Sequence, residues 1–528
     1  MDIRSILLIA LFMSIGKFNS AEGAKILSIF PYSGPSQYIF ISPLLKALAE
    51  KGHEVTSIST FPQKKPLKNF RDVVVMENSN IFDEMFTQAT AGEAEGKSFF
   101  EEFAELSSLG VTASSNVMEN VDVKKLLKNE KFDLIIIEVF GTESLFGLGE
   151  YFQAPMIGVS TFGTIGFIDY LTANPSPASY IPHMSLEYDS HMSLWQRTVN
   201  VLTNVVDNLC TNFFLIAGQE KVYKKYFPNA KLSLDEARRN VSLVLLNDHF
   251  SLQAPRPYVP NMIEVGGLHI KQKPDPLEED LQKFLDDSPE GVIYFSMGSN
   301  AKSKDLAPHT LQAILSTFAE LKIKVLWKFE LEELPNKPAN VVIRKWFNQP
   351  SILAHPNVKL FISHGGYLST TETIFHGKPI LGIPVLGDQF MNVKNAVKAG
   401  FALRLDLRSL TKEKFMQSIQ ELWTNPRYTN AVKTLSKRYR DQPLTPLETA
   451  IFWVEYVLRH DGAPHIRNAG QDLSFWQYHN IDVYLLLASC IVVVFTLIAS
   501  LIRFGKKLIC AISKSMKKSK KSKIKKNK

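Results

Sequence analysis

Residues 346–389 read WFNQPSILAHPNVKLFISHGGYLSTTETIFHGKPILGIPVLGDQ, and this stretch decides the fold. Its middle predicts a strand at Lys359–Ser363, a glycine turn at His364–Gly366 and a helix at Ser369–His376. A strand that enters a helix through a glycine turn directs backbone N–H groups and the positive end of the helix dipole at one point, where a phosphate can bind. A second strand is expected at Pro379–Pro384. Since ligands of open α/β sheets collect at the carboxyl edge of the strands, we expect a phosphate-containing ligand there.

Residues suited to ligand binding stand at fixed spacing through this stretch, seven by their side chains and Gly366 by its backbone. They are Trp346, Gln349, His364, Gly366, Ser369, Glu372, Asp388 and Gln389. Taken singly, each has an ordinary explanation, such as a core tryptophan, a capping serine or a solvated acid. Taken together, the spacing resembles the 44-residue signature of the UDP-glycosyltransferases, the glucuronosyltransferase-like family, which in plants is called the PSPG box. The runs HGGYLSTTE and GIPVLGDQ are most similar to those of insect members, and the resemblance covers essentially the whole chain.

The resemblance implies a role for each of these residues. Trp346 would cover the uracil ring, as aromatic side chains stack on bases. His364 would donate to the diphosphate, and Glu372 would accept from the ribose hydroxyls. Asp388 and Gln389 would bond the sugar hydroxyls. The other expected donor-site positions in this stretch are Gln349, Gly366 and Ser369.

The first residues are typical of a secretory signal peptide. Arg4 precedes the apolar run Ile6–Ile15, and small residues follow at Ser20–Gly23. The run is too short to cross a membrane, so we expect cleavage near its end and a lumenal chain. Only Cys210 of the three cysteines lies in that lumenal part, so no intramolecular lumenal disulfide is expected. Asn240 begins the only N-glycosylation sequon.

The next segment begins a Rossmann-like half. A strand at Ala24–Phe30, a helix at Tyr38–Lys51 and a strand at Glu54–Ser59 form a βαβ unit whose first loop should face a cleft. In the family this loop carries the catalytic histidine, after a small residue and before the helix. The matching residue here is Gln37. Because glutamine cannot accept a proton at any useful pH, Gln37 can only orient an acceptor through hydrogen bonds.

Glu138 matches the family's aspartate that orients this histidine. It ends the apolar strand Phe132–Ile137, and a plain strand-end acid is the ordinary alternative. Without a histidine to orient, Glu138 is either a relic or the base itself, with a pKa raised by an apolar cleft. The sequence leaves both readings open.

Acceptor pockets of the family draw on variable segments that correspond here to residues 72–123 and 160–194. Aromatic residues in them are candidates for pocket lining, although such residues are more often core: Phe99, Phe100, Phe162, Phe167 and Tyr170. The strongly apolar segment Val199–Ile216 carries Asp207 and several asparagines, which favours a buried or membrane-touching helix over a span.

A second Rossmann-like half follows a breaker-rich stretch containing five prolines between residues 255 and 276. Its first strand is expected at Val292–Ser296, followed by the turn Met297–Asn300. Ser299 resembles a family residue that contacts the donor phosphates across from His364.

The C-terminal end predicts a membrane anchor. Val483–Ile502 contains 20 residues and no charge, enough to cross a hydrocarbon core of ~30 Å. The tail after it has 12 Lys or Arg and no acid, which places it in the cytosol. The rest of the chain has 48 basic and 52 acidic residues, so the basic character belongs to the tail and no nucleic-acid partner is expected. Lys525 and Lys526 resemble a dilysine endoplasmic-reticulum retrieval signal. The alternative is that they are simply two more lysines of a lysine-rich tail.

The predicted organisation has seven parts. They are a signal peptide (1–23), an N-terminal acceptor-binding Rossmann-like domain (24–254), a linker (255–288), a C-terminal UDP-sugar-binding Rossmann-like domain (289–443), a return helix and juxtamembrane segment (444–480), a transmembrane helix (483–502) and a basic cytosolic tail (503–528).

We therefore expect an α/β protein of the GT-B fold, with two Rossmann-like domains facing a cleft. The resemblance implies transfer of a hexose, glucose rather than glucuronate, from a UDP-sugar to a small lipophilic acceptor with inversion, in detoxification-type conjugation. The enzyme would be a single-pass type I protein of the endoplasmic-reticulum membrane, in contact with membrane lipid. The sequence is compatible with a homo-oligomer or a hetero-oligomer. The expected co-substrate is UDP-glucose or another UDP-hexose, with no further cofactor and no metal.

Two alternatives follow from Gln37. The protein is a UDP-sugar-binding regulatory or hetero-oligomeric partner with weak or no transfer, or it is an enzyme restricted to acceptors that need no base, such as amines.

Overall fold

The computed structural model describes residues 23–92 and 99–526, so the predicted signal peptide lies outside the described residues except for Gly23. The chain up to Asn468 forms one compact unit, and Ala469 begins a second. The first unit is built on two parallel sheets, each with its own apolar core.

The N-terminal sheet has seven strands in the order β3-β2-β1-β4-β5-β6-β7. Their bounds are β1 Lys25–Phe30, β2 Glu54–Ser59, β3 Phe70–Val74, β4 Leu134–Glu138, β5 Met156–Ser160, β6 Leu243–Leu246 and β7 Met262–Glu264. Every described pair is parallel. The central strands are fully buried apolar runs, as parallel strands covered by helices on both faces require.

The C-terminal sheet has six strands in the order β10-β9-β8-β11-β12-β13, also parallel. Their bounds are β8 Val292–Ser296, β9 Lys324–Lys328, β10 Val341–Arg344, β11 Val358–Ser363, β12 Ile380–Gly382 and β13 Ala402–Arg404. The order turns back between β8 and β11, and such a switch point opens a crevice at the carboxyl ends of the strands.

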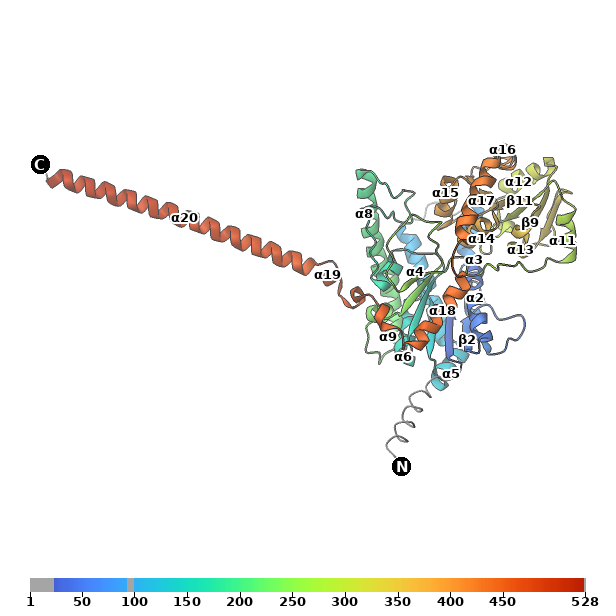
Figure 1. Ribbon diagram of the computed structural model, residues 1–528, viewed down its shortest axis with the longest axis horizontal. Helices are drawn as coiled ribbons and strands as arrows, with labels where there is room; N and C mark the ends of the chain where they lie inside the picture. Colours follow the sequence, from blue (N-terminus) through green and yellow to red (C-terminus); the bar gives the residue numbers. More distant parts are fainter. Residues whose placement is uncertain (1–22, 93–98, 527–528) are drawn as a thin grey trace, which may run out of the picture. The chain divides into compact units, whose positions relative to one another are not determined.

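Helices cover both sheets (Figure 1). In the N-terminal half they are α2 Pro35–Glu50, α3 Asp83–Ala91, α4 Phe99–Glu119, α5 Val121–Asn129, α6 Gly147–Phe152, α7 Gly166–Thr172, α8 Leu194–Cys210, the π-helical turn η3 Thr211–Ile216, α9 Ala217–Tyr226 and α10 Leu234–Arg239. In the C-terminal half they are α11 Glu279–Asp286, α12 Pro308–Glu320, α13 Gln349–Ala354, α14 Tyr367–His376, α15 Gln389–Lys398, α16 Lys412–Thr424, α17 Pro426–Arg440 and α18 Pro446–Arg459.

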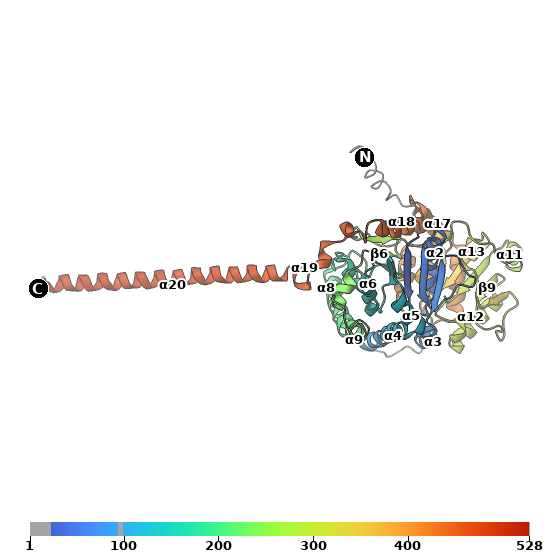
Figure 2. The ribbon, with the colours of Figure 1, turned by 90° about the horizontal axis from the view of Figure 1, so that it is seen from below.

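Helix α18 returns to the first domain and packs beside α2 (Figures 1 and 2). Thr445 and Glu448 form a capping box at its start, and Pro446 occupies the first turn. Its buried residues Ala450 and Val454 join the apolar cluster that contains the α2 and β1 side chains. The return helix therefore joins the two halves of the first unit.

Two boundaries differ from the expectations. Helix α2 begins at Pro35 rather than near Tyr38, because proline suits the first helical position, so Gln37 lies in the first turn of the helix and not in the loop before it. The first sheet also extends into the expected linker, since its edge strand β7 pairs with β6.

The second unit contains the short helix α19 Phe475–Tyr478 and the long helix α20 Ile481–Lys526. By length and composition, the part from Ile481 to Lys520 can cross a membrane, and it contains the predicted span. The helix continues through the basic tail, beyond the predicted end of the span at residue 502.

Candidate active site

A cavity of about 470 Å³ opens at the carboxyl ends of the strands of both sheets. The N-terminal domain contributes Ser36 and Gln37 from the start of α2 and Thr161 and Phe162 after β5. The C-terminal domain contributes a larger set: Ser296, Gly298, Ser299, Asn300, Lys328, Trp346, Gln349, His364, Gly366, Ser369, Glu372, Asp388 and Gln389. All nine donor-site residues predicted from the sequence therefore line one cavity.

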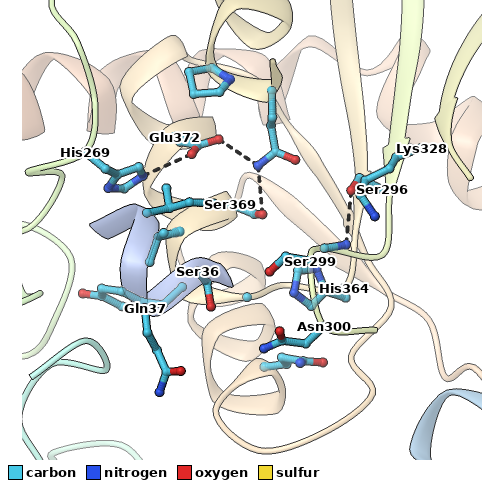
Figure 3. Close-up of a pocket in the computed structure, with 18 of the residues that line it drawn as sticks. Ser36, Gln37, His269, Ser296, Ser299, Asn300, Lys328, His364, Ser369 and Glu372 are labelled. Carbon is cyan, nitrogen blue, oxygen red and sulfur yellow. Dashed lines mark hydrogen bonds and ion pairs between the residues drawn. The ribbon is translucent and has the colours of Figure 1, made fainter. Parts of the chain in front are cut away.

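The His364 ring is held in a slot made by glycines. A Cβ atom on Gly298 would lie 2.3 Å from Cε1 of His364, and one on Gly366 would lie 2.4 Å from Nε2. Side-chain hydroxyls fix the two turns, since Ser296 Oγ accepts from the Gly298 N–H and Ser363 Oγ accepts from the Gly365 N–H, each at 3.1 Å. The two glycines therefore enclose the His364 ring, which Figure 3 shows close to Ser299 and Asn300.

Burial, followed by the nearby Lys328 ammonium, lowers the pKa of His364 to about 4. The imidazole is therefore neutral at pH 7 and can donate one N–H, and its Nδ1 has no hydrogen-bond partner among the described residues. Helix α14 begins beside it at Gly366 without a side-chain cap. The free first-turn N–H groups and the imidazole thus converge on one anion-binding point.

The Glu372 carboxylate is oriented by bonds to both of its oxygens. Gln349 Nε2 donates to Oε2 of Glu372 at 2.7 Å and to Ser369 Oγ at 3.0 Å. His269 Nε2 lies 3.1 Å from Oε1 of Glu372, and both side chains are buried (Figure 3). A fixed carboxylate of this kind can accept hydrogen bonds from two vicinal hydroxyls.

His269 is a site residue that the sequence analysis missed. It follows strand β7 in the run Gly266-Gly267-Leu268-His269, within the expected linker. The glycine pair before it marks a backbone turn at the carboxyl end of a strand, and this signal could have identified it.

Trp346 stands at the open side of the cavity with 56% of its side chain exposed. The Lys328 ammonium lies 5.7 Å from the ring centroid and is paired with Glu330 at 2.6 Å. An exposed indole face beside a cation is suited to stack on a flat base.

Asp388 and Gln389 lie together at the start of α15. Asp388 accepts from Asn392 Nδ2 at 2.7 Å, and burial raises its pKa to about 6. Gln389 Oε1 accepts from the backbone N–H groups of Val385 at 2.8 Å and Leu386 at 3.1 Å. These bonds use the amide oxygen of Gln389, and its NH₂ group is the part suited to a ligand hydroxyl.

Gln37 and Glu138 are brought together, but in different positions relative to the cavity. Gln37 lines the cavity, whereas Glu138 is fully buried and is not among the described lining residues. Thr161 Oγ1 donates to Glu138 Oε1 at 3.3 Å, and the nearby Gln37 side chain also favours the ionised carboxyl. Burial outweighs both and raises the pKa of Glu138 to about 8, so this acid is mostly protonated at neutral pH.

Of the aromatic residues predicted as acceptor-pocket lining whose side chains the structure describes, only Phe162 lines the cavity, and the side chain of Phe99 lies outside the described residues. Phe162 lines the cavity and packs against Phe140, whereas Phe167 packs against the N-terminal core. Asn240 ends helix α10 at the surface, where its Oδ1 accepts from Arg467 at 2.8 Å. Glycosylation of Asn240 stays a prediction.

Comparison with known proteins connects this geometry to a family. The model of "UDP-glucoronosyl and UDP-glucosyl transferase" matches residues 24–518. UDP-glucosyltransferase 2 of Dactylopius coccus is 37% identical over 92% of this chain and 94% of its own length. UDP-glucuronosyltransferase 2C1 of Oryctolagus cuniculus is 29% identical over 86% of this chain and 93% of its own.

Solved structures share the fold. A UDP-glucose: anthocyanidin 3-O-glucosyltransferase in complex with UDP superposes with a TM-score of 0.55 at 14% identity, over 83% of this chain and all of that one. The calicheamicin glycosyltransferase CalG4 gives 0.54 at 15% identity, over 84% and 100%. The chain has the GT-B fold and belongs to the UDP-glycosyltransferase family.

Proposed function

We propose that this protein binds a UDP-sugar in the cavity and transfers its hexose, with inversion, to a small lipophilic acceptor. One observation carries the proposal. Trp346, His364 and Glu372, the candidates for binding uracil, phosphate and ribose, lie in the C-terminal domain. They line the same cavity as Gln37 of the N-terminal domain. Glucose is favoured over glucuronate because the 37% identical insect relative is named a glucosyltransferase.

In such a transfer, the acceptor atom attacks the anomeric carbon from the face opposite UDP. The bond between that carbon and the diphosphate oxygen breaks, and its electron pair leaves with UDP. The start of α14, the His364 N–H and the Lys328 ammonium would stabilise the charge that develops on the diphosphate. Asp388 and Gln389 would hold the hexose, and Glu372 the ribose.

The acceptor must also lose a proton, and the two residues predicted to take part in this step are Gln37 and Glu138. Gln37 cannot take it, and Glu138 lies behind Gln37 with its own proton in place at neutral pH. Hydroxyl acceptors would therefore react slowly. A neutral amine attacks without prior deprotonation and loses its proton afterwards, so amines would be the better acceptors.

The same arrangement favours a second candidate function. A protein that binds UDP-sugar but lacks a base at the acceptor would serve as a regulatory or hetero-oligomeric partner with little transfer of its own. Its donor side would be intact.

The test measures UDP release by the purified full chain from UDP-glucose and from UDP-glucuronate, with 4-methylphenol and 4-methylaniline as matched acceptors. We expect release from UDP-glucose, and more with the amine. UDP binding without release with either acceptor would favour the regulatory function. Failure to bind UDP at all would contradict both.

We further propose that the protein is a single-pass type I protein of the endoplasmic reticulum, with its catalytic domains in the lumen. Helix α20 supplies the span, and the basic tail after it favours the cytosolic side. A lumenal transferase with lipophilic acceptors is suited to detoxification-type conjugation.

A further inference from the structure

Helix α8 of the first unit exposes a wide apolar face. Seven apolar side chains of α8 and two of the following turn η3 are exposed: Leu194, Trp195, Val201, Leu202, Val205, Val206, Leu209, Phe213 and Phe214. At about 100° per residue, the seven from α8 fall within an arc of roughly 140°. Trp195 is 73% exposed and Leu202 60%. A wide exposed apolar face of this kind on a globular unit is typical of an interaction site.

The opposite face of α8 is fixed to the globular unit. Asn200 is buried and donates to the carbonyls of Ala178 at 2.8 Å and Ile181 at 2.9 Å. His183 lies 3.6 Å from Asp207 on the same side. By length and composition the helix from Leu194 to Tyr226 can cross a membrane. However, α8 is bonded to the globular unit along one side, so only its other side is available to a partner. The helix can therefore lie on the surface of a membrane but cannot span it.

Three asparagines along the edge of this apolar face donate hydrogen bonds to the helix backbone. Asn204, Asn208 and Asn212 each donate from Nδ2 to the carbonyl oxygen of the asparagine four residues earlier, at 2.8 Å in every case. Their N–H groups therefore need less water than exposed amides usually do, and this edge can approach an apolar phase at a reduced cost.

The short tether between the first unit and the candidate membrane span in α20 favours lipid as the partner. Asn468, the last residue of the first unit, donates from Nδ2 to the carbonyl of Ala173 at 2.9 Å. Ala173 follows α7, and the segment after it supplies the carbonyls that hold Asn200 of α8. Only Ala469–Asn480 separate Asn468 from α20, a tether of at most about 40 Å.

We propose that α8 lies in the interface of a phospholipid bilayer, as a second membrane contact besides α20. The apolar face would rest at the boundary between headgroups and acyl chains, which suits its exposed tryptophan and phenylalanines. This contact would hold the domain that carries Gln37 against the membrane.

The first test uses the full chain in phosphatidylcholine liposomes, with Cys490 and Cys510 changed to serine and the buried Cys210 kept. A nitroxide is attached to Leu202→Cys or, as the control, to Gln312→Cys at an exposed position of α12. We expect the label at 202 to collide with oxygen and be shielded from a water-soluble nickel reagent, and the label at 312 to show the reverse.

Two outcomes of this test would overturn the proposal. In one, both labels are equally accessible to the nickel reagent. In the other, the label at 202 is shielded from both reagents and shows spin–spin broadening, because then a second copy of the chain covers the face.

The second test places a protease site within Ala469–Asn480 of the reconstituted chain and follows flotation after cleavage. We expect the wild-type unit to stay with the vesicles and Leu202→Asp/Val205→Asp/Leu209→Asp to lose at least about tenfold in partitioning. The control His309→Asp/Gln312→Asp/Ala319→Asp changes three exposed α12 positions to the same residue and should behave as wild type. Melting curves verify that each variant is folded. Equal retention of both triple variants, or complete release of the wild type, would overturn the proposal.

Discussion

At the residue scale, the Glu372 carboxylate depends on side chains far away in sequence. Gln349 and His269 hold its two oxygens, and these residues come from α13 and from the segment after β7. If the ribose binds Glu372, as the family resemblance implies, His269 is a positioning residue that fixes the direction of the carboxylate. Its substitution should therefore affect recognition of the ribose hydroxyls more than recognition of the rest of the nucleotide.

We expect His269→Ala to lower UDP affinity by roughly tenfold, the cost of one charge-assisted hydrogen bond. Affinity for 2′-deoxy-UDP, which offers Glu372 one hydroxyl fewer, should fall less. His269→Gln, whose amide can reach the position of Nε2, should recover most of the loss. Titration calorimetry with both nucleotides measures the ratio. An equal loss for UDP and 2′-deoxy-UDP would mean that His269 acts only on stability.

Glu138 makes the stability of the protein depend on pH. Its pKa is about 8 in the folded protein and near 4.5 when unfolded, so the folded state binds more protons between these values. Its contribution to the free energy of unfolding is fully present below about pH 4.5 and is lost as the pH rises through about 8.

Glu138→Gln should accordingly flatten the decline of the unfolding free energy between pH 5 and 8, which for one such group approaches about 1.4 kcal/mol per pH unit. Denaturant unfolding at several pH values measures the slope. The exposed Glu290→Gln is the control and should leave the slope unchanged. A wild-type slope identical to that of Glu138→Gln would show that Glu138 is ionised in the folded protein.

At the scale of the element, the turn between β11 and α14 works only if the His364 ring fits between the glycines. Gly366 has an ordinary helix-entry backbone, so an alanine there adds no backbone strain and acts only through contact of its Cβ with Nε2 of His364. By contrast, Gly298 and Gly365 have positive φ values that alanine would strain as well.

Gly366→Ala should therefore displace the imidazole and weaken UDP binding about as much as His364→Ala, roughly 1.5–3 kcal/mol for a hydrogen bond to a charged group. Binding of uridine, which has no phosphate, should change little. Gly166→Ala, where a Cβ meets nothing within 4 Å, is the matched control. If Gly366→Ala bound UDP normally, the glycine slot would have no role in phosphate binding.

The same elements show how far the sequence predicts the site. The convergence of the nine predicted donor-side residues on one cavity was predictable because they lie in or beside strand–turn–helix units with fixed local spacing, and their donor-binding roles stay predictions. His269 was not, because it enters the cavity from a segment about 100 residues before its partner Glu372. The burial of Glu138 depends on how α2 packs against β4 and β5, which the sequence does not specify, and Gln37 lies in the helix because α2 begins at Pro35.

At the scale of the whole molecule, the proposed topology divides the charge of the chain between two environments. Along the chain, the compact unit precedes the hydrophobic part of α20 and the basic tail follows it, so the proposed topology makes a direct prediction. Protease added to sealed microsomes should remove only residues after about 502. Detergent-permeabilised microsomes serve as the control, in which the whole chain is digested. Digestion of the compact unit in intact vesicles would contradict the type I orientation.

The proposed lack of a catalytic base is tested most directly by initial rates of UDP release with 4-methylphenol and 4-methylaniline, for wild type, Gln37→His, Glu138→Ala and the double variant. If the donor side is complete and only a base is lacking, Gln37→His should raise phenol glycosylation by about two to four decades and amine glycosylation far less. Adding Glu138→Ala should remove much of that gain, because the imidazole loses the group that orients it. If instead Glu138→Ala alone abolishes wild-type phenol transfer and Gln37→His adds nothing, Glu138 is itself the base and the account is contradicted.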